Sequence, residues 1–399
     1  MRIVCAWGQH NYGDPSRGES YEYVNFLPAL KALGHQVSFI ETWNRSRYAD
    51  FAALNGQLLR TVEALRPDLL FVVLLSYEIW VETLDLIRGA VGCPVLNWGT
   101  DDSWKYRSFS RFIAPHVDRY ATTYENALQQ FLGDGIANVV LTQWAANSAT
   151  LREPLPAADC EHAVSFVGSA YGRRPQWIAA LQSRGLEVEC FGHGWSNGPV
   201  QAERIPEIIR NSVISLNFSE AAHGAGAGRQ VKARVFEVPG NGGFLLTQDA
   251  PGLDRFYAPG CEIETFNRSE ELAAKVEHYL ANTEARDRIA RAGHARTRQH
   301  HTYERRFTEL LAGIAPKEPR DVRAEVARQQ MDTLARRHRT TWWQRVLARA
   351  LAAPGVALWG PRRGRRAARR MMFELSWRLA GEHTYTSRGL PGRLFYAES

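Results

Sequence analysis

Three basic side chains and one carboxylate lie within the stretch RQVKARVFE, which runs from Arg229 to Glu237. Arg234 and Glu237 are three positions apart, so on a helix their side chains point the same way. A guanidinium binds phosphate oxygens through charge-assisted hydrogen bonds, and a carboxylate accepts hydrogen bonds from hydroxyl groups. Together with Lys232, these residues could hold a ligand that carries a diphosphate next to a ribose.

Glycines flank this stretch on both sides. The segment AHGAGAGR (222–229) would let the backbone approach a ligand closely, or would be a merely flexible loop. Beyond Glu237 we expect a helix to end at Pro239-Gly240 and a strand to begin at Gly243. Asn241, Gly242 and Gly243 would then form a tight turn, either an ordinary connection or one whose N–H groups a ligand can reach.

A second basic pair, Arg173 and Arg174, follows the apolar run AVSFVG. The run predicts a strand that ends at Gly168, and Pro175 suits the first turn of a helix. Helix N-termini and nearby arginines both favour phosphate oxygens. The spacing matches neither the Walker lysine pattern nor a full G-x-G-x-x-G, so two solvated surface arginines remain the alternative.

The elements that must position these residues alternate regularly between strands and helices. One set of apolar runs predicts strands at 2–7, 36–41, 68–75, 93–98, 118–123 and 138–143, and a second set at 163–168, 187–192, 213–218, 243–248 and 261–266. The run DLLFVVLL is nearly continuous, as expected of a parallel strand buried on both faces. The sequence thus predicts an α/β fold of two Rossmann-like doubly wound domains, with the strand ends facing one another across a cleft.

The expected boundaries are a first domain at 1–147, a polar, proline-bearing linker at 148–162, a second domain at 163–315 and a helical extension at 316–399. Five scattered cysteines, odd in number and without a C-x-x-C pair, argue against a disulfide framework and a structural zinc site. The N-terminal residues are not expected to be a signal peptide, and no run approaches the roughly 18 apolar residues of a membrane span. We therefore expect a cytoplasmic protein with no metal and no other cofactor.

The pieces FVGSAYGRR, CFGHGW, SLNFSE, RVFEVPGNGGFLLTQD and HHTYERRF follow one another in an order that resembles the CgeB-like (spore maturation protein) glycosyltransferases, which have the GT-B fold. The resemblance covers roughly 160–311, and TDDSWKY extends it loosely into the first half. It implies a metal-independent, hexosyltransferase-type enzyme that moves a sugar from a nucleotide diphosphate donor to a hydroxyl acceptor. The acceptor would belong to a cell-surface glycan or a lipid-linked saccharide.

The resemblance also implies roles for single residues in the second domain. Glu237 would bind the ribose hydroxyls, Arg174 and Arg234 would lie near the diphosphate, and the turn at 241–243 would offer N–H groups to the donor. The retaining pattern of two glutamates eight apart is missing, since Glu220 and Glu237 are seventeen apart, and the stereochemical outcome stays open. The full predicted donor set is Gly168, Arg173, Arg174, Asn217, Arg229, Lys232, Arg234, Glu237, Asn241, Gly242 and Gly243.

Acceptor contacts are expected in two loops of the first domain, because binding residues gather at the carboxyl ends of strands. The loop QHNYGDPSRGES (9–20) holds Tyr12, Gly13 and Asp14. The segment GTDDSWKY (99–106) offers Asp101 as a general base for an acceptor hydroxyl, with Asp14 as the second catalytic candidate. Asp102 or Ser103 more readily caps the following helix.

Basic charge is concentrated near the C-terminus. The segment from Arg336 to Arg370 holds eleven arginines and no Asp, Glu or Lys, whereas the whole chain carries +7, so the remainder is net acidic. As a helix, residues 340–373 would place Trp343, Leu347 and Leu351 on one apolar stripe, with Arg345 and Arg349 on another face. Tryptophan beside arginine predicts an anionic membrane surface as partner of residues 336–373, on the inner face of the cell membrane. A helix packed on the protein's own first domain is the alternative, and nucleic acid is not expected.

Three other functions stay open at this point: a GT-B nucleotide-sugar epimerase or hydrolase, a two-lobed sugar-binding protein without turnover, and a membrane-associated scaffold. The scaffold would leave the arrangement of Arg174, Arg234 and Glu237 unexplained.

Overall fold

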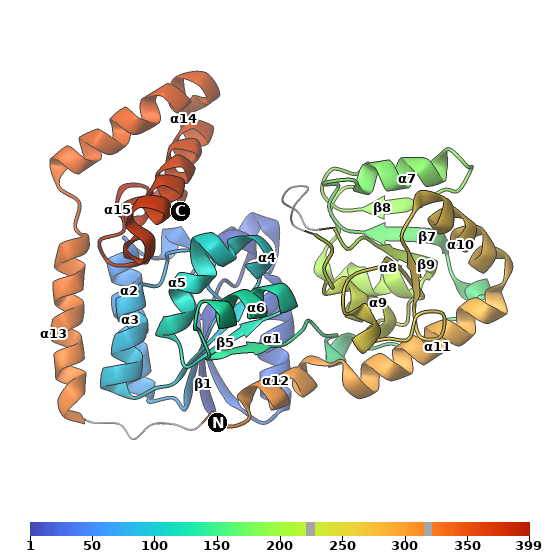
Figure 1. The fold of residues 1–399 in the computed structure, drawn as a ribbon, viewed down its shortest axis with the longest axis horizontal. Helices are drawn as coiled ribbons and strands as arrows, with labels where there is room; N and C mark the ends of the chain where they lie inside the picture. The colour runs from blue at the N-terminus through green and yellow to red at the C-terminus, as the bar shows by residue number, and fades with distance from the viewer. Residues whose placement is uncertain (221–227, 315–320) are drawn as a thin grey trace. The chain divides into compact units, whose positions relative to one another are not determined.

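A computed structural model describes residues 1–220, 228–314 and 321–399, which form two compact units (Figure 1). Unit 1 comprises Met1–Thr142 and Leu311–Ser399, and unit 2 comprises Gln143–Leu310. The predicted glycine loop at 222–229 therefore lies outside the described residues except for Gly228 and Arg229. Within those ranges, no helix is long and apolar enough to cross a membrane.

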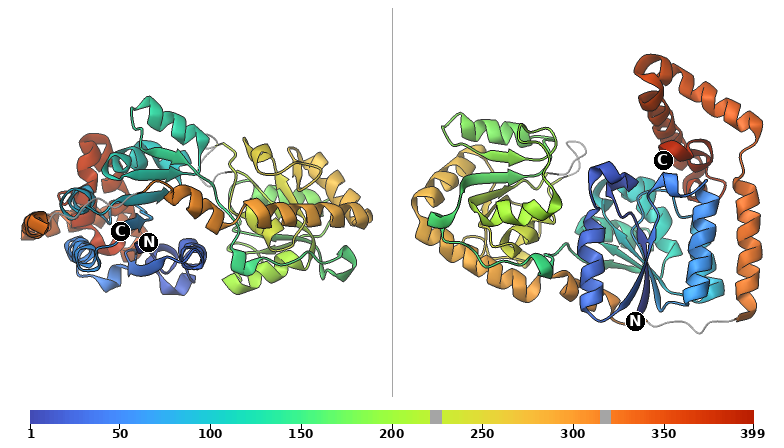
Figure 2. Two further views of the ribbon diagram at one scale, coloured as in Figure 1. Left: turned by 90° about the horizontal axis from the view of Figure 1, so that it is seen from below. Right: turned by 180° about the vertical axis from the view of Figure 1, so that it is seen from behind.

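Unit 1 is built on a six-stranded parallel sheet in the order β2-β1-β3-β4-β5-β6. The core strands are apolar and almost entirely buried, with helices on both faces of the sheet (Figure 2), which is why their sequences read as continuous hydrophobic runs. The strands are β1 (Arg2–Trp7), β2 (Gln36–Glu41), β3 (Leu69–Val72), β4 (Val95–Gly99), β5 (Arg119–Thr122) and β6 (Val139–Leu141). The helices among them are α1 (Tyr21–Ala32), α2 (Phe51–Leu65), α3 (Val81–Leu86), α4 (Asp102–Lys105), α5 (Arg111–Ile113) and α6 (Glu125–Gly133).

Unit 2 repeats this architecture with a five-stranded parallel sheet in the order β11-β10-β9-β7-β8. Its strands are β7 (His162–Val167), β8 (Glu189–Phe191), β9 (Ser212–Asn217), β10 (Leu245–Gln248) and β11 (Glu264–Phe266). Its helices are α7 (Arg174–Gln182), α8 (Ile205–Arg210), α9 (Arg234–Gly240), α10 (Ser269–Ala281) and α11 (Thr283–His300), and α12 (Tyr303–Leu311) follows. Each unit is thus a Rossmann-like domain, and the predicted fold class is confirmed.

The predicted linker at 148–162 is an ordered part of unit 2. The buried Arg286 donates to the Leu155 carbonyl oxygen at 2.8 Å, and the Ala157 N–H donates to Asp287 Oδ1 at 3.0 Å. These bonds from α11 hold the segment against the unit, so its polar and proline-rich composition reflects irregular backbone rather than a free connection.

The C-terminal extension packs on the sheet domain of unit 1. In α13 (Asp321–His338), the buried side chains Ala327, Met331 and Leu334 join the core that α2 lines. The helix α14 (Trp342–Ala380) bends at Gly360, whose φ of 78° is not helical, so the predicted single helix at 340–373 has two arms. Tyr385, between α14 and α15 (Leu390–Leu394), is fully buried in the same core.

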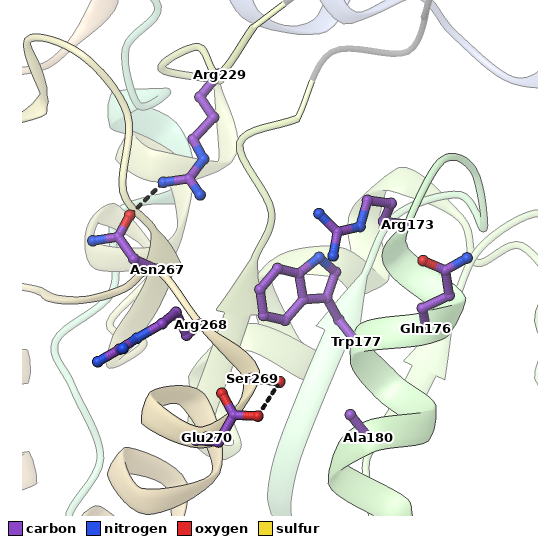
Figure 3. A pocket seen from close by; sticks show the side chains of 9 residues that line it. All are labelled: Arg173, Gln176, Trp177, Ala180, Arg229, Asn267, Arg268, Ser269 and Glu270. Atoms are coloured by element: carbon purple, nitrogen blue, oxygen red, sulfur yellow. Dashed lines mark hydrogen bonds between the residues drawn. The ribbon is translucent and has the colours of Figure 1, made fainter. Parts of the chain in front are cut away.

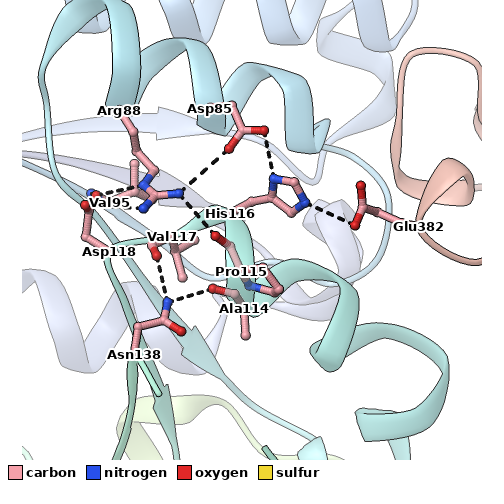
Figure 4. A network of polar contacts seen from close by, with 10 residues as sticks. All are labelled: Asp85, Arg88, Val95, Ala114, Pro115, His116, Val117, Asp118, Asn138 and Glu382. Atoms are coloured by element: carbon pink, nitrogen blue, oxygen red, sulfur yellow. Dashed lines mark hydrogen bonds and ion pairs between the residues drawn. The ribbon is translucent and has the colours of Figure 1, made fainter. Parts of the chain in front are cut away.

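A polar network ties this extension to the sheet domain (Figure 4). His116 donates from Nδ1 to the Asp85 carboxylate at 2.8 Å and forms a 3.4 Å ion pair with Glu382 of the extension. Burial lowers the pKa of His116, but the two carboxylates outweigh it and the net pKa is raised. Arg88 extends the network to Asp118 at 3.1 Å, next to β5.

Candidate functional site

The carboxyl ends of β7 and β9 bring most of the predicted donor residues to one edge of the unit 2 sheet. The strand β7 ends at Val167 and is followed by a loop into α7, while β9 ends at Asn217 and its connection leads to α9. Since the strands are parallel neighbours, both loops lie at the same edge. We call Arg174, Lys232 and Arg234 the basic cluster, and Tyr171, Glu220 and Glu237 contact it.

Arg174 is a buried cation. It donates from Nη1 to the Ser169 carbonyl oxygen at 2.9 Å and from Nη2 to the Tyr171 hydroxyl at 2.8 Å, and its guanidinium lies 3.8 Å from the centre of the Tyr171 ring. Burial lowers the pKa of Arg174, and the charge of Arg234 lowers it further. The Nε atom is buried without a hydrogen-bond partner. The environment thus holds the guanidinium in a fixed orientation without neutralising it.

Lys232 is held at the same tyrosine. Its Nζ donates to the Tyr171 hydroxyl at 2.8 Å and to the carbonyl oxygen of Glu220. Burial and then the charge of Arg174 lower the pKa of Lys232 to about 7, against an opposing effect of Glu220. Two cations therefore converge on one neutral hydroxyl, and an anion bound beside them would stabilise both charged forms.

Arg234 and Glu237 form an ion pair of 2.8 Å between Arg234 Nη1 and Glu237 Oε2, with both side chains about one-fifth exposed. Both lie on α9, three residues apart, so the predicted common orientation is confirmed. A half-buried carboxylate aligned by a guanidinium can still accept hydrogen bonds from ligand hydroxyls with its free lone pairs.

Arg173 and Arg229 lie beside a pocket of about 390 Å³ whose walls come from α7, α10 and the loop before α10 (Figure 3). Arg173 approaches Glu220 at 3.8 Å, and Arg229 bonds to Asn267. Arg268 and the buried Trp177 also line the pocket. The two predicted arginines thus border the basic cluster through Glu220, and neither is part of the buried group.

Gly168 shapes the loop after β7. A side chain there would lie 2.9 Å from the Phe166 ring and 3.3 Å from Arg174. The Trp195 indole N–H donates to the Gly168 carbonyl oxygen at 2.8 Å, so the CFGHGW segment supports the loop from behind. Gly168 therefore serves the site by admitting Arg174.

The structure contradicts the prediction for the turn at 241–243. The Asn241 N–H donates to the Glu237 carbonyl oxygen at 2.8 Å, Gly242 to Pro239 at 3.1 Å and Gly243 to Val238 at 2.8 Å. All three donors close the C-terminal end of α9, and the turn precedes β10. In a parallel sheet that is the edge opposite the basic cluster. The glycines are explained by packing, since a side chain on Gly242, whose φ is +82°, would lie 2.7 Å from the Arg152 carbonyl oxygen.

Asn217 was also predicted to contact the donor, but the structure gives it a role inside the sheet. It is buried, and its Nδ2 donates to Thr247 Oγ1 of β10 at 2.8 Å. Tyr171, by contrast, was not predicted, although it lies within the quoted FVGSAYGRR. A tyrosine in a glycine-bearing loop has no distinctive spacing, so only the fold reveals that it joins Arg174 to Lys232.

In unit 1 the predicted base Asp101 lies at the carboxyl end of β4 beside two other ionisable groups. Asp101 Oδ2 is 3.4 Å from Lys105 Nζ, which also donates to the Leu75 carbonyl oxygen at 3.2 Å. Glu22, in the first turn of α1, is buried next to this pair. Burial, and to a lesser extent the charge of Asp101, raise the pKa of Glu22 to about 7 against an opposing effect of Lys105. Sequence reasoning missed Glu22 because it and Asp101 are far apart in the chain.

Asp102 does not cap the helix as predicted. It accepts bonds from Ser110 Oγ at 2.5 Å and from the Tyr120 hydroxyl at 2.8 Å, and burial raises its pKa. The cap position of α4 is Asp101, whose side chain makes no capping bond. The exposed carboxylate of Asp101 is therefore not used by the helix.

The loop at 9–20 is an ordered structure with an exposed aromatic ring. Tyr12 has a positive φ of 55° and Gly13 one of 71°, and a side chain on Gly13 would clash with the Trp43 carbonyl group. Such backbone strain in a bulky residue is concentrated at functional sites. Asp14, the second catalytic candidate, caps the next turn by accepting from the Ser16 N–H at 3.0 Å, and this hydrogen bonding lowers its pKa. Asp14 is thus a poor base.

In the described parts of the chain, no group of three or more His, Cys, Asp or Glu side chains could hold a metal ion. His301, within HHTYERRF, is buried, and burial lowers its pKa to about 4. It bonds to the Phe256 carbonyl oxygen at 2.8 Å, so it packs and holds a loop.

Comparisons with known proteins agree with this architecture. Residues 173–312 match the family described as glycosyl transferase-like, whereas no curated protein matches the chain. The solved structures that share its fold include the following three. Alr3699/HepE of Anabaena in complex with UDP is 11% identical, with a TM-score of 0.53, and the match covers 78% of this chain and 100% of that one. A glycosyltransferase of Rickettsia africae is 11% identical, with a TM-score of 0.55 and coverages of 78% of this chain and 98% of that one. The sucrose-phosphate synthase of Thermosynechococcus elongatus is 11% identical, with a TM-score of 0.53 and coverages of 84% of this chain and 98% of that one. The chain therefore has the fold of the GT-B glycosyltransferases, with a glycosyl transferase-like segment at residues 173–312.

Proposed function

We propose that this protein is a metal-independent glycosyltransferase of the CgeB-like type, which moves a hexosyl group from a nucleotide diphosphate sugar to a hydroxyl group. The acceptor is a cell-surface glycan or a lipid-linked saccharide, and the protein works in the cytoplasm, at the inner face of the membrane. The observation that carries the proposal is the basic cluster, in which Arg174 and Lys232 share the Tyr171 hydroxyl.

The donor occupies the carboxyl edge of the unit 2 sheet. Its diphosphate lies beside Arg174, Lys232 and Arg234, because phosphate oxygens accept charge-assisted bonds from all three. Glu237 accepts hydrogen bonds from the ribose hydroxyls. HepE, which has the same fold, binds UDP, and this supports a nucleoside diphosphate as the ligand here.

The acceptor hydroxyl loses its proton in unit 1. Asp101 is the exposed carboxylate at the carboxyl edge of that sheet, and Lys105 holds it at 3.4 Å. Glu22 lies behind it with a pKa of about 7, which suits a group that receives and returns a proton near neutral pH. Tyr12, exposed on its strained turn, offers a ring on which a sugar can stack.

The test is a screen of nucleotide-sugars for thermal stabilisation, followed by transfer assays with any donor that binds. A ligand at about 100 times its dissociation constant stabilises a protein by roughly 2.7 kcal/mol, which a thermal scan detects. The Asp101→Asn variant should keep donor affinity and lose roughly 10²–10⁴-fold in turnover. Release of free sugar with every acceptor tested would instead indicate a hydrolase, and binding without any turnover would indicate a sugar-binding protein.

A further inference from the structure

Several large apolar side chains of α14 are exposed to solvent. Trp342 is 77% exposed, Leu358 is 72% exposed and Trp359 is 57% exposed, and Trp343, Val346 and Leu347 are exposed as well. Exposed apolar patches of this kind on a soluble domain mark an interaction surface. Of the predicted stripe, Trp343 and Leu347 are therefore exposed, whereas Leu351 is partly buried against the cluster that contains Phe395.

Small residues form the face of α14 that is buried instead. The two arms fold back on each other at Gly360, and a side chain on Gly364 would lie 2.2 Å from the Val356 nitrogen of the other arm. Ala348, Ala352 and Ala368 pack in the same cluster, closed by Phe395. Close contact through alanine and glycine joins the two arms and leaves no room for the tryptophans between them.

The exposed apolar residues follow one line of the first arm. Trp343, Leu347, Ala350, Pro354 and Leu358 recur every three or four positions, which places them on one side of a helix. The line ends at the bend, where Leu358 and Trp359 precede Gly360. Figure 1 and Figure 2 show this bend at the end of the hairpin farthest from the sheet of unit 1.

Arginines surround the apolar line. Arg345 and Arg349 flank it on the first arm, and Arg362, Arg363 and Arg366 are exposed directly after the bend. Of the eleven arginines between 336 and 370, Arg365 forms an ion pair, with Glu398, and the described residues give none to the other ten. A partner must therefore be both apolar and strongly negative.

We propose that the hairpin of α14 docks on an anionic lipid surface, with Leu358 and Trp359 inserted below the headgroups and the arginines bound to lipid phosphates. Tryptophan and leucine next to arginine suit the boundary between headgroups and acyl chains. A nucleic acid would satisfy the arginines but would leave the apolar line in water. A second copy of this chain would bring an equally basic surface, which the arginines would repel.

The test is co-sedimentation of the full chain with phosphatidylcholine vesicles that contain phosphatidylglycerol. Binding should need phosphatidylglycerol and should weaken steeply as salt rises from about 0.1 M to about 1 M, since the Debye length falls from about 10 Å to about 3 Å. The measurement involves no donor and no acceptor, so its outcome is independent of the proposed transferase activity.

Two variants separate the components of binding. The double substitution Arg362→Glu and Arg366→Glu should weaken binding by at least about 30-fold, because each arginine near the surface contributes about fivefold and each new carboxylate is repelled by the anionic lipids. The double substitution Leu358→Ser and Trp359→Ser should weaken it by about tenfold or more and should abolish the part that survives high salt. Circular dichroism should show that both variants fold, since all four side chains are exposed.

Matched controls come from surfaces away from the hairpin. Arg288→Glu with Arg291→Glu on α11 makes the same charge change, and Leu132→Ser on α6 removes another exposed leucine. Neither should alter vesicle binding. The proposal is overturned if the wild-type chain ignores phosphatidylglycerol vesicles at low salt, or if the controls weaken binding as much as the hairpin variants do. It is also overturned if the Leu358 and Trp359 variant loses only self-association in sedimentation velocity.

Discussion

Lys232 is the residue whose protonation should change most directly when the donor binds. Its pKa of about 7 in the empty site means that it is largely neutral at pH 8. A bound diphosphate favours the charged form, so binding of UDP above pH 7 should take up as much as one proton. UDP affinity should then fall by up to about tenfold per pH unit between about pH 7 and pH 9.

Calorimetry in two buffers of different ionisation enthalpy measures this proton uptake. The Lys232→Met variant should bind UDP more weakly at pH 7 and should show neither proton uptake nor the pH dependence. Full proton uptake in that variant would assign the titration to another group and remove Lys232 from the phosphate site.

Glu22 gives a second prediction at the residue scale, in which stability and activity change in opposite directions. Because burial raises its folded pKa from the model-compound value of 4.5 to about 7, the folded state disfavours its ionised form. The free energy of unfolding should therefore fall as pH rises from about 4.5 to about 7. Glu22→Gln should raise stability at pH 8, on the order of 1–3 kcal/mol, and leave it unchanged at pH 4.

The same Glu22→Gln substitution should lower transferase turnover if Glu22 shares the proton with Asp101. Urea unfolding at the two pH values and a rate measurement on the same sample test both statements. A variant that is less stable at pH 8 would mean that the carboxylate is favourably bound in the folded chain, contrary to the geometry.

Contacts between side chains were predicted from sequence only where local spacing determines them. The Arg234–Glu237 pair is local, and three positions on a helix suffice to predict it. The convergence of Arg174 and Lys232 on Tyr171 needs two loops that meet across the sheet, which spacing cannot reveal. The 241–243 turn was misread because glycines required by close packing look the same in sequence as glycines that admit a ligand.

At the scale of elements, the strand positions were predictable and the strand ends were not. Parallel strands buried on both faces give unbroken apolar runs, and a strand overlaps every run that predicts one. The runs extend beyond the paired residues because apolar side chains just outside a strand are buried as well, as at Val73 and Leu74 after β3. The bend of α14 was missed because the apolar periodicity continues up to Gly360.

The contact between His116 and Glu382 predicts how the C-terminal extension responds to pH. The folded pKa of His116 is raised, so its contribution is fully present below about pH 6.5 and is lost as pH rises through the raised value. Glu382→Gln should lower stability at pH 6 and have no effect at pH 9. The change should stay below about 1 kcal/mol, because Glu382 is half exposed.

Urea unfolding curves of this variant and of Glu277→Gln, an exposed control on α10, test that prediction. An equal loss of stability at both pH values would show that Glu382 acts through packing, and not through the charge of His116.

The chain forms two sheet domains one after the other, and its C-terminal extension then returns to the first domain. Because Tyr385 belongs to the core of unit 1, ending the chain before Arg336 removes part of that core. The truncated chain should therefore unfold at a lower temperature, whereas the Leu358 and Trp359 variant should not. Differential scanning calorimetry distinguishes the two, and a truncated chain with wild-type stability would mean that the extension is an independent appendage.

The central claim is that unit 2 binds a nucleotide diphosphate at the basic cluster, and one set of titrations tests it. UDP and uridine are titrated onto the wild-type chain, Arg234→Gln and Glu237→Ala, with GDP, ADP and TDP tried next if UDP does not bind. Arg234→Gln should weaken the diphosphate by roughly 10- to 100-fold and leave the nucleoside unchanged, whereas Glu237→Ala should weaken both by the same factor. If no nucleoside diphosphate binds, or if both variants bind it as the wild type does, the basic cluster is not a donor site.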